Sequence, residues 1–240
     1  MDLSYSKISL FTECPRKFKF AYVDKIAIPE NRSMLIGSAL HWLLQRYYSK
    51  IDIVPEHEFE KEIIDVAQRI LEKYIQKYKL IDDFKTIDHE VPFTFKRNDI
   101  TWNGKIDLVI EKDNKLYIVD HKYSSRKFIE SFMALNFQGV LYYYYYGYVL
   151  GKNVTGIIWN TISCPNKLLK DGSLSTTLEM QRFITYKTDK EVSKMWQTID
   201  EVVEDIQNEK FIPHISRQLC EYCPYIEECI IMQKGLDESS

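Results

Sequence analysis

The segment Asn103–Ser124, NGKIDLVIEKDNKLYIVDHKYS, decides the fold of this chain. Two apolar runs flank Asp113-Asn114, a residue pair that is typical of a tight two-residue turn. Residues 100–111 and 115–123 are therefore predicted to be the two strands of an antiparallel hairpin. Because the turn sets the register, residues equidistant from it should face each other across the two strands.

Asp107 and Asp120 are equidistant from that turn. They are predicted to lie opposite each other, with Lys122 two residues farther along on the same face. Two facing carboxylates are unfavourable unless something neutralises them, as Mg²⁺ or Mn²⁺ would, and a nearby lysine could then orient or deprotonate water. The same register places Lys105 opposite Lys122, which a bulge or parting strands would relieve. The spacing alone fits an exposed, water-facing hairpin equally well.

The rest of the chain alternates helical and strand patterns. Helices are predicted from Ser4 or Ser6 to Cys14 and at 33–49, 55–79, 131–150 and 189–208, and further strands at 91–95, 154–162 and 181–186. This order indicates an α/β fold in which helices flank a mixed β-sheet. Residues 131–150 carry no charge, but six tyrosines with Asn136 and Gln138 favour a buried helix over a membrane span.

Composition leaves the class of partner open. The chain has 240 residues, 45% of them hydrophobic, and no obvious linker, so a single domain over residues 1–240 is expected. The net charge of −3 gives no overall attraction to nucleic acid, although a site built from carboxylates and a metal is acidic in any case. The first residues do not form a signal peptide. A cytoplasmic protein is therefore expected, whose clustered cysteines would be metal ligands rather than disulfides.

Cysteines gather near the end of the sequence. CEYCPYIEEC, Cys220–Cys229, contains three of the five cysteines, and the other two are Cys14 and Cys164. Four thiolates would suit either Zn²⁺ or an iron–sulfur cluster. The spacing by itself favours zinc.

Several motifs resemble those of the PD-(D/E)XK nucleases. Gly104–Asp107 (GKID) and Val119–Lys122 (VDHK) resemble the family's G-x-x-D and (D/E)-x-K motifs. His41, in GSALHWLLQRYY, resembles the metal-binding histidine that the RecB-like branch has on an early helix. Gln138 and Tyr142 resemble the Q-x-x-x-Y motif of the same branch. The chain departs from the commonest pattern in having aspartate rather than glutamate in the second motif and no proline before the first aspartate.

This resemblance implies a restriction-endonuclease-like core over residues 30–210 and a set of site residues. The Mg²⁺ or Mn²⁺ ligands would be His41, Asp107, Asp120 and the backbone carbonyl of His121. Lys122 would activate water, and Gln138 with Tyr142 would position the substrate. Glu90, just before a predicted strand, is interpreted as an ordinary exposed residue rather than an additional ligand.

An early cysteine followed by C-x2-C-x5-C is similar to the iron–sulfur subgroup of the RecB-like branch, which includes CRISPR-associated exonucleases and AddB-type nuclease domains. The resemblance makes Cys14 the fourth ligand beside Cys220, Cys223 and Cys229, and favours [4Fe-4S] over Zn²⁺. The cluster region would be residues 1–29 with 211–233. Such a site closes a very long loop and is expected to be structural. Cys164 is interpreted as an ordinary loop cysteine.

The resemblance implies a metal-dependent deoxyribonuclease, an exonuclease on single-stranded DNA or free DNA ends. Its setting would be CRISPR spacer acquisition in antiviral defence, or phage-type recombination, with an integrase, recombinase or helicase as a possible partner. The chain contains no G-x-x-x-x-G-K-[ST] phosphate loop, so a motor would be a separate protein. Two alternatives remain: a non-catalytic DNA-binding or complex-forming subunit that keeps this fold and cluster, and a zinc-stapled interaction module of another fold.

Overall fold

The computed structural model describes residues 1–50, 59–78, 83–164 and 178–235. The chain divides into two compact units, which are considered separately. One unit is Glu30–Val192, and the other combines Met1–Pro29 with Ser193–Ser240. The single domain over residues 1–240 stays a prediction.

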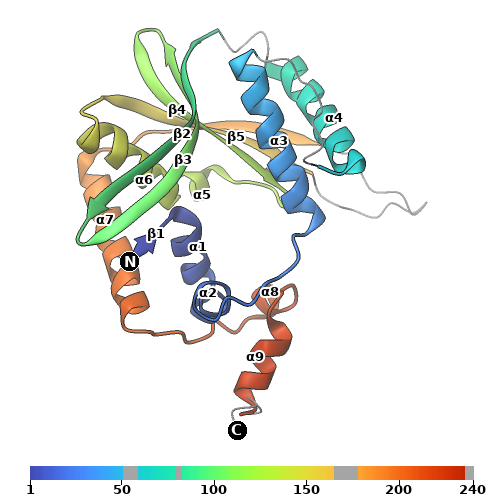
Figure 1. Ribbon diagram of the computed structural model, residues 1–240. Coiled ribbons are helices and arrows are strands. Elements are labelled where there is room, and N and C mark those ends of the chain that lie inside the picture. Colours follow the sequence, from blue (N-terminus) through green and yellow to red (C-terminus); the bar gives the residue numbers. More distant parts are fainter. Residues whose placement is uncertain (51–58, 79–82, 165–177, 236–240) are drawn as a thin grey trace. The chain divides into compact units, whose positions relative to one another are not determined.

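The unit Glu30–Val192 is built on a mixed β-sheet, which confirms the predicted α/β fold (Figure 1). Its strands lie in the order β2-β3-β4-β5-β6. Only the β4–β5 pair is parallel among these neighbours. The bounds are β2 (Lys85–Arg97), β3 (Ile100–Lys112), β4 (Lys115–Ser124), β5 (Val154–Ser163) and β6 (Glu179–Thr185).

The β3–β4 hairpin has the predicted turn and register. Asp113 and Asn114 have φ values of 52° and 57°, the left-handed backbone of a type I′ turn. Leu108 pairs with Val119, as equidistance from this turn requires. The ladder ends at that pair, one residue short of the two aspartates. The strands therefore part at the aspartates.

Strand β2 extends the hairpin on its other side and is longer than predicted. Pro92 is tolerated because β2 lies at the edge of this unit's sheet. In the β2–β3 register His89 pairs with Leu108 and Val91 with Ile106, which places Glu90 across from Asp107. Glu90 has a φ of 50°, a left-handed conformation that is costly for a residue with a Cβ.

Helices cover both faces of the sheet (Figure 1). α3 (Arg32–Ser49) and α4 (Lys61–Tyr78) pack on one face, where they share a core with Ile162 and Met180. The predicted start of the second helix, at Pro55, lies outside the described residues. On the other face α6 (Phe137–Tyr143) approaches so closely that a Cβ on Gly139 would lie 3.1 Å from Ile157 Cδ1.

The prediction of one continuous helix over 131–150 is wrong. The segment forms α5 (Glu130–Ala134), α6 and the π-helix η2 (Tyr144–Val149). The break lies at Asn136, whose side chain accepts a hydrogen bond from the backbone N–H of Gln138 and so caps α6. An N-cap needs non-helical backbone, so a helix cannot run through this residue. Among the described helices, none has both the length and the apolarity to cross a membrane.

The second unit brings the two ends of the chain together. It holds β1 (Asp2–Leu3), α1 (Tyr5–Glu13, capped by Ser4), α2 (Pro15–Phe18), η1 (Lys19–Val23), most of α7 (Asp189–Gln207), α8 (Arg217–Cys220) and α9 (Ile226–Gln233). Aromatic contacts join its N- and C-terminal segments. The rings of Phe18 and Phe211 stack at 6.2 Å, and those of Phe20 and Tyr225 lie 5.6 Å apart.

Candidate functional site

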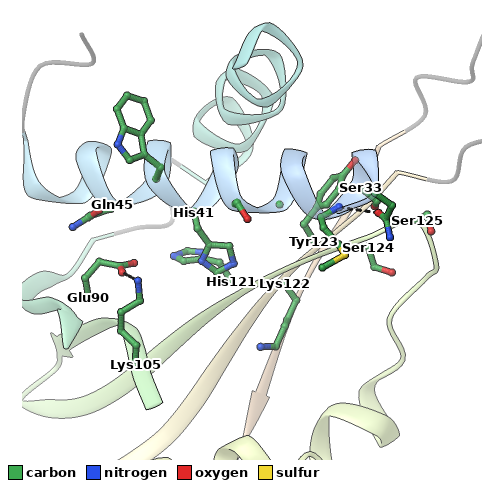
Figure 2. Close-up of a pocket in the computed structure, with 15 residues that line it drawn as sticks. Ser33, His41, Gln45, Glu90, Lys105, His121, Lys122, Tyr123, Ser124 and Ser125 are labelled. Atoms are coloured by element: carbon green, nitrogen blue, oxygen red, sulfur yellow. Dashed lines mark hydrogen bonds and ion pairs between the residues drawn. The ribbon is translucent and has the colours of Figure 1, made fainter. Parts of the chain in front are cut away.

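A cavity of about 710 Å³ opens between α3 and the β2–β3–β4 strands (Figure 2). His41 and Gln45 line it from α3, Glu90 from β2 and Lys105 from β3, and His121 to Ser125 line it from β4 and the residue after it. The β3–β4 ladder ends at Leu108 and Val119, and both His121 and Lys122 of β4 line the cavity.

Asp107, just beyond the end of the β3–β4 ladder, contacts His41 of α3. Its Oδ2 is 3.5 Å from His41 Nδ1 and accepts the backbone N–H of His121 at 2.7 Å. Burial by itself would raise the pKa of Asp107, but attraction to His41 and the hydrogen bond with it hold the pKa well below its usual range. Burial opposes the charged form of His41, yet attraction to Asp107 raises the pKa of His41. The two groups stabilise each other's charged forms.

Glu90 completes a possible metal-binding set. One ligand atom from each of His41, Glu90 and Asp107 lies within 4.8 Å of the others. An imidazole nitrogen with two carboxylate oxygens suits a divalent cation, and the nitrogen favours Mn²⁺ over Mg²⁺. Glu90 also forms an ion pair with Lys105, and its side chain is only 14% exposed. The interpretation of Glu90 as an ordinary exposed residue is therefore wrong.

Asp120 lies in a closed ring of contacts with three other predicted site residues. Its Oδ1 accepts the Tyr142 hydroxyl at 2.7 Å, and Gln138 Nε2 donates to the same hydroxyl oxygen at 2.6 Å. Gln138 Oε1 accepts from Lys122 Nζ at 2.6 Å. Lys122 Nζ closes the ring at 2.8 Å from Asp120 Oδ2, as an ion pair without hydrogen-bond alignment. The ring holds the lysine in one orientation beside the cavity.

Asp120 and Tyr142 are the deeply buried members of the ring, and burial is the largest influence on the pKa of each. Asp120 is 1% exposed; burial raises its pKa, and attraction to Lys122 offsets this only in part. Burial, together with repulsion from Asp120 and Asp107, raises the pKa of Tyr142 well above its ordinary value. Tyr142 therefore stays a hydroxyl that donates to Asp120.

The side chain of His121 lies on the α3–α4 face, away from Asp120 and Lys122, as predicted. Its ring is 5.7 Å from that of Tyr48 and stacked on it, and Nδ1 lies 3.5 Å from Asn160 Nδ2. Burial lowers the pKa of His121 to about 3. The assignment of its backbone carbonyl as a metal ligand stays a prediction.

The cysteines of the second unit lie around one small cavity. Its lining includes all four predicted cluster ligands, Cys14, Cys220, Cys223 and Cys229. No three cysteine sulfurs of the described residues come within 4.8 Å of one another. Cys164 lies elsewhere, directly after β5, where its backbone N–H donates to the carbonyl of Ser124.

A family model for the PD-(D/E)XK nuclease superfamily matches residues 2–230. The chain belongs to this superfamily. Among solved structures, this chain resembles a candidate exonuclease from Eubacterium rectale, with a TM-score of 0.58 and 13% sequence identity. The match covers 99% of this chain and 93% of the other. It also matches the protein SSO0001, with a TM-score of 0.46 and 14% identity over 93% and 83% of the two chains. No curated protein matches significantly.

In this nuclease-superfamily chain, the predicted residues form two adjoining groups. His41 and Asp107 belong to the ligand set, whereas Asp120, Lys122, Gln138 and Tyr142 form the ring. Asp120 is not part of the ligand set found among the described residues, because its oxygens face Tyr142 and Lys122. Sequence reasoning considered Glu90 as an additional ligand and rejected it. The turn Asn98-Asp99, with φ values of 50° and 59°, could have revealed it, since Glu90 and Asp107 are equidistant from that turn.

Proposed function

We propose that this protein is a metal-dependent deoxyribonuclease that hydrolyses DNA from its ends. The observation that carries the proposal is the juxtaposition of the ligand set His41–Glu90–Asp107 with the ring that orients Lys122. The chain's superfamily membership and its resemblance in fold to a candidate exonuclease support it.

The residues have distinct roles in this proposal. His41, Glu90 and Asp107 would hold Mn²⁺ or Mg²⁺, with Asp120 and the His121 carbonyl as further predicted ligands. When bound, the cation supplies positive charge that acidifies water and stabilises negative charge on the phosphodiester. Lys122 lines the cavity and donates hydrogen bonds to the reacting water or a phosphate oxygen. Gln138 and Tyr142 hold Lys122 and Asp120 in place.

The substrate and setting are inferred from the resemblance of the motifs. The substrate would be single-stranded DNA or DNA with free ends. The setting would be CRISPR spacer acquisition or phage-type recombination, with a separate integrase, recombinase or helicase as the partner.

The test uses protein purified anaerobically and linear DNA labelled at one end, with Mn²⁺. We expect the wild type to shorten linear DNA and to spare closed circles of the same sequence. Lys122→Ala should reduce the rate by about 10²–10³-fold, because it removes a donor beside the reacting phosphate. Lys127→Ala is the matched control, because Lys127 forms a surface ion pair with Glu179 and does not line the cavity.

Each result has a definite meaning. Equal cleavage by Lys122→Ala and the wild type would refute the assignment of the ring. Cleavage of closed circles would refute the requirement for DNA ends. Binding of DNA without cleavage by folded, Mn²⁺-loaded protein would favour the non-catalytic subunit.

We further propose that Cys14, Cys220, Cys223 and Cys229 hold a [4Fe-4S] cluster. Their common cavity supports a shared ligand. The preference for a cluster over Zn²⁺ rests on the resemblance of the cysteine spacing to the iron–sulfur subgroup.

Iron and acid-labile sulfide, measured against zinc in anaerobically purified protein, test this proposal. Cys14→Ala should lower the iron content and the visible absorbance and increase proteolysis of the two chain ends. Cys164→Ala, which changes a cysteine outside that cavity, should do neither. One zinc per chain without iron would overturn the cluster.

A further inference from the structure

Lys105 and Lys122 lie on the two strands that part at the site, and both line its cavity. Their equal distance from the Asp113-Asn114 turn predicted that they would face each other, which is unfavourable for two cations. In the structure each lysine has a carboxylate of its own. Lys122 pairs with Asp120, and Lys105 pairs with Glu90, as Figure 2 shows.

The two lysines are held differently. The Lys122 side chain is 23% exposed, and its ammonium group contacts Gln138 as well as Asp120. The Lys105 side chain is 58% exposed, and its ammonium group forms one ion pair, with Glu90, in the described part of the chain. An exposed lysine stem turns easily, and an exposed ion pair contributes little to stability. Lys105 can therefore exchange Glu90 for another anion, whereas Lys122 is fixed.

Glu90 has a second possible partner. The carboxylate that pairs with Lys105 also belongs to the ligand set His41–Glu90–Asp107. A carboxylate that binds a divalent cation attracts an ammonium group less strongly, and the cation repels that group directly. Because side chains alternate along a strand, Lys105 and Asp107 lie on the same face of β3. The ammonium group is therefore within reach of a phosphate bound beside the ligand set.

We propose that a cation bound at Glu90 releases Lys105, and that the freed ammonium group binds a phosphate of the DNA strand in this cavity. Lys105 neutralises Glu90 before the cation binds and the substrate afterwards, so it couples cation binding to DNA binding. The proposal rests on the proposed nuclease function and adds to it a substrate-binding residue. It also explains why a lysine, which opposes a cation, lies beside the ligand set.

Two binding measurements test the proposal without relying on cleavage. Lys105→Met keeps the aliphatic stem and removes the charge. The electron paramagnetic resonance signal of free Mn²⁺, measured without DNA, should show Mn²⁺ binding tightened by about threefold or more, because the competitor for Glu90 is gone. Fluorescence anisotropy of a single-stranded oligonucleotide, with saturating Ca²⁺ in place of Mn²⁺, should show Kd raised about tenfold, because a charge-assisted phosphate contact is lost.

The dependence on Ca²⁺ tests the release itself. As Ca²⁺ is lowered, Lys105 returns to Glu90, so the oligonucleotide affinities of Lys105→Met and the wild type should converge to within about twofold. Lys112→Met is the matched control, because Lys112 lies on the same strand but does not line the cavity. It should change neither Mn²⁺ affinity nor oligonucleotide Kd by more than about twofold. Lys105→Gln replaces Lys105→Met if that variant does not fold.

The outcomes separate this inference from the function on which it rests. Unchanged or weaker Mn²⁺ binding by Lys105→Met, or oligonucleotide affinity equal to that of a wild type that binds, would overturn the role of Lys105 and leave the proposed function intact. An equal loss of oligonucleotide affinity at every Ca²⁺ concentration would mean that Lys105 contacts DNA without being released, and would overturn the coupling. A wild type without oligonucleotide affinity in saturating Ca²⁺ would overturn both.

Discussion

Asp107 and Asp120 are the same residue type at positions equidistant from one hairpin turn, yet the two carboxyl groups have opposite pKa shifts. Burial disfavours the charge of both. Attraction to His41 and a hydrogen bond with it reverse that effect at Asp107 and hold its pKa low. At Asp120 burial prevails over the attraction of Lys122, and the pKa is raised. The two carboxylates thus acquire different environments through their partners.

The difference assigns the two carboxylates different roles in the proposed mechanism. Asp107 lies in the open ligand set, where its charge is available to a cation. Asp120 is enclosed by Tyr142 and Lys122, and its contacts with them hold both side chains in position. Each of the following predictions tests that contrast.

The largest effects are expected from Asp107→Asn and Asp120→Asn. Both should reduce cleavage by about 10²–10³-fold or more, since each removes charge at the reacting phosphate. Their effects on stability should differ. Asp107→Asn should lower the free energy of unfolding at pH 7 by about 1–3 kcal/mol, because the folded state favours that charge. Asp120→Asn should cost less, because folding disfavours its charge.

Denaturant unfolding without added metal measures this difference, with Asp65→Asn, an exposed α4 residue, as the control. An equal or greater loss of stability in Asp120→Asn would contradict the conclusion that folding favours the charge of Asp107 and disfavours that of Asp120.

Tyr142→Phe tests the role of the ring that encloses Asp120. Removing the hydroxyl that bonds Asp120 and Gln138 should slow cleavage by about 10–100-fold, because Asp120 and Lys122 lose their orientation. Tyr143→Phe is the matched control, since its hydroxyl bonds the Lys187 backbone instead. Its cleavage rate should stay within about threefold of the wild type. Comparable losses in both variants would mean that the ring has no special role.

Glu90→Gln tests the ligand set to which Asp107 belongs. Replacing one carboxylate of the ligand set should weaken Mn²⁺ binding by about tenfold or more, measured from the electron paramagnetic resonance signal of free Mn²⁺. Glu179→Gln removes a carboxylate from a surface ion pair and should leave Mn²⁺ affinity unchanged. Unchanged affinity in Glu90→Gln would remove Glu90 from the set.

The smallest effect is expected from Glu90→Gly. Glycine adopts the left-handed backbone of this position without steric cost, so the free energy of unfolding should rise by about 0.5–1 kcal/mol. Glu90→Gln keeps a Cβ and should show no such gain. A gain in Glu90→Gly together with lost Mn²⁺ binding would show that the strain is tolerated for the sake of the ligand. A loss of stability would contradict this account.

Several features of the site could be predicted because they depend on local rules. The Asp113-Asn114 turn fixed the hairpin register up to the residues next to the two aspartates, and the spacing of Gln138 and Tyr142 placed both on one helix face. Glu90 was within reach of the same reasoning through the turn at Asn98-Asp99. The irregular β2–β3 register between Thr86 and Asp88 shows why strand patterning there was less informative.

The sequence by itself determined the approximate positions of the strands, the Asp113-Asn114 turn with the register of its hairpin, and the residue types that meet near the parting strands. These depend on backbone geometry within a few residues, so they can be derived from the chain alone. Only the tertiary structure decided which partner each group obtained: His41 for Asp107, Tyr142 for Asp120 and Asn160 for His121. Those partners come from α3, α6 and β5. Their effects depend on burial and distance, which a linear spacing does not contain.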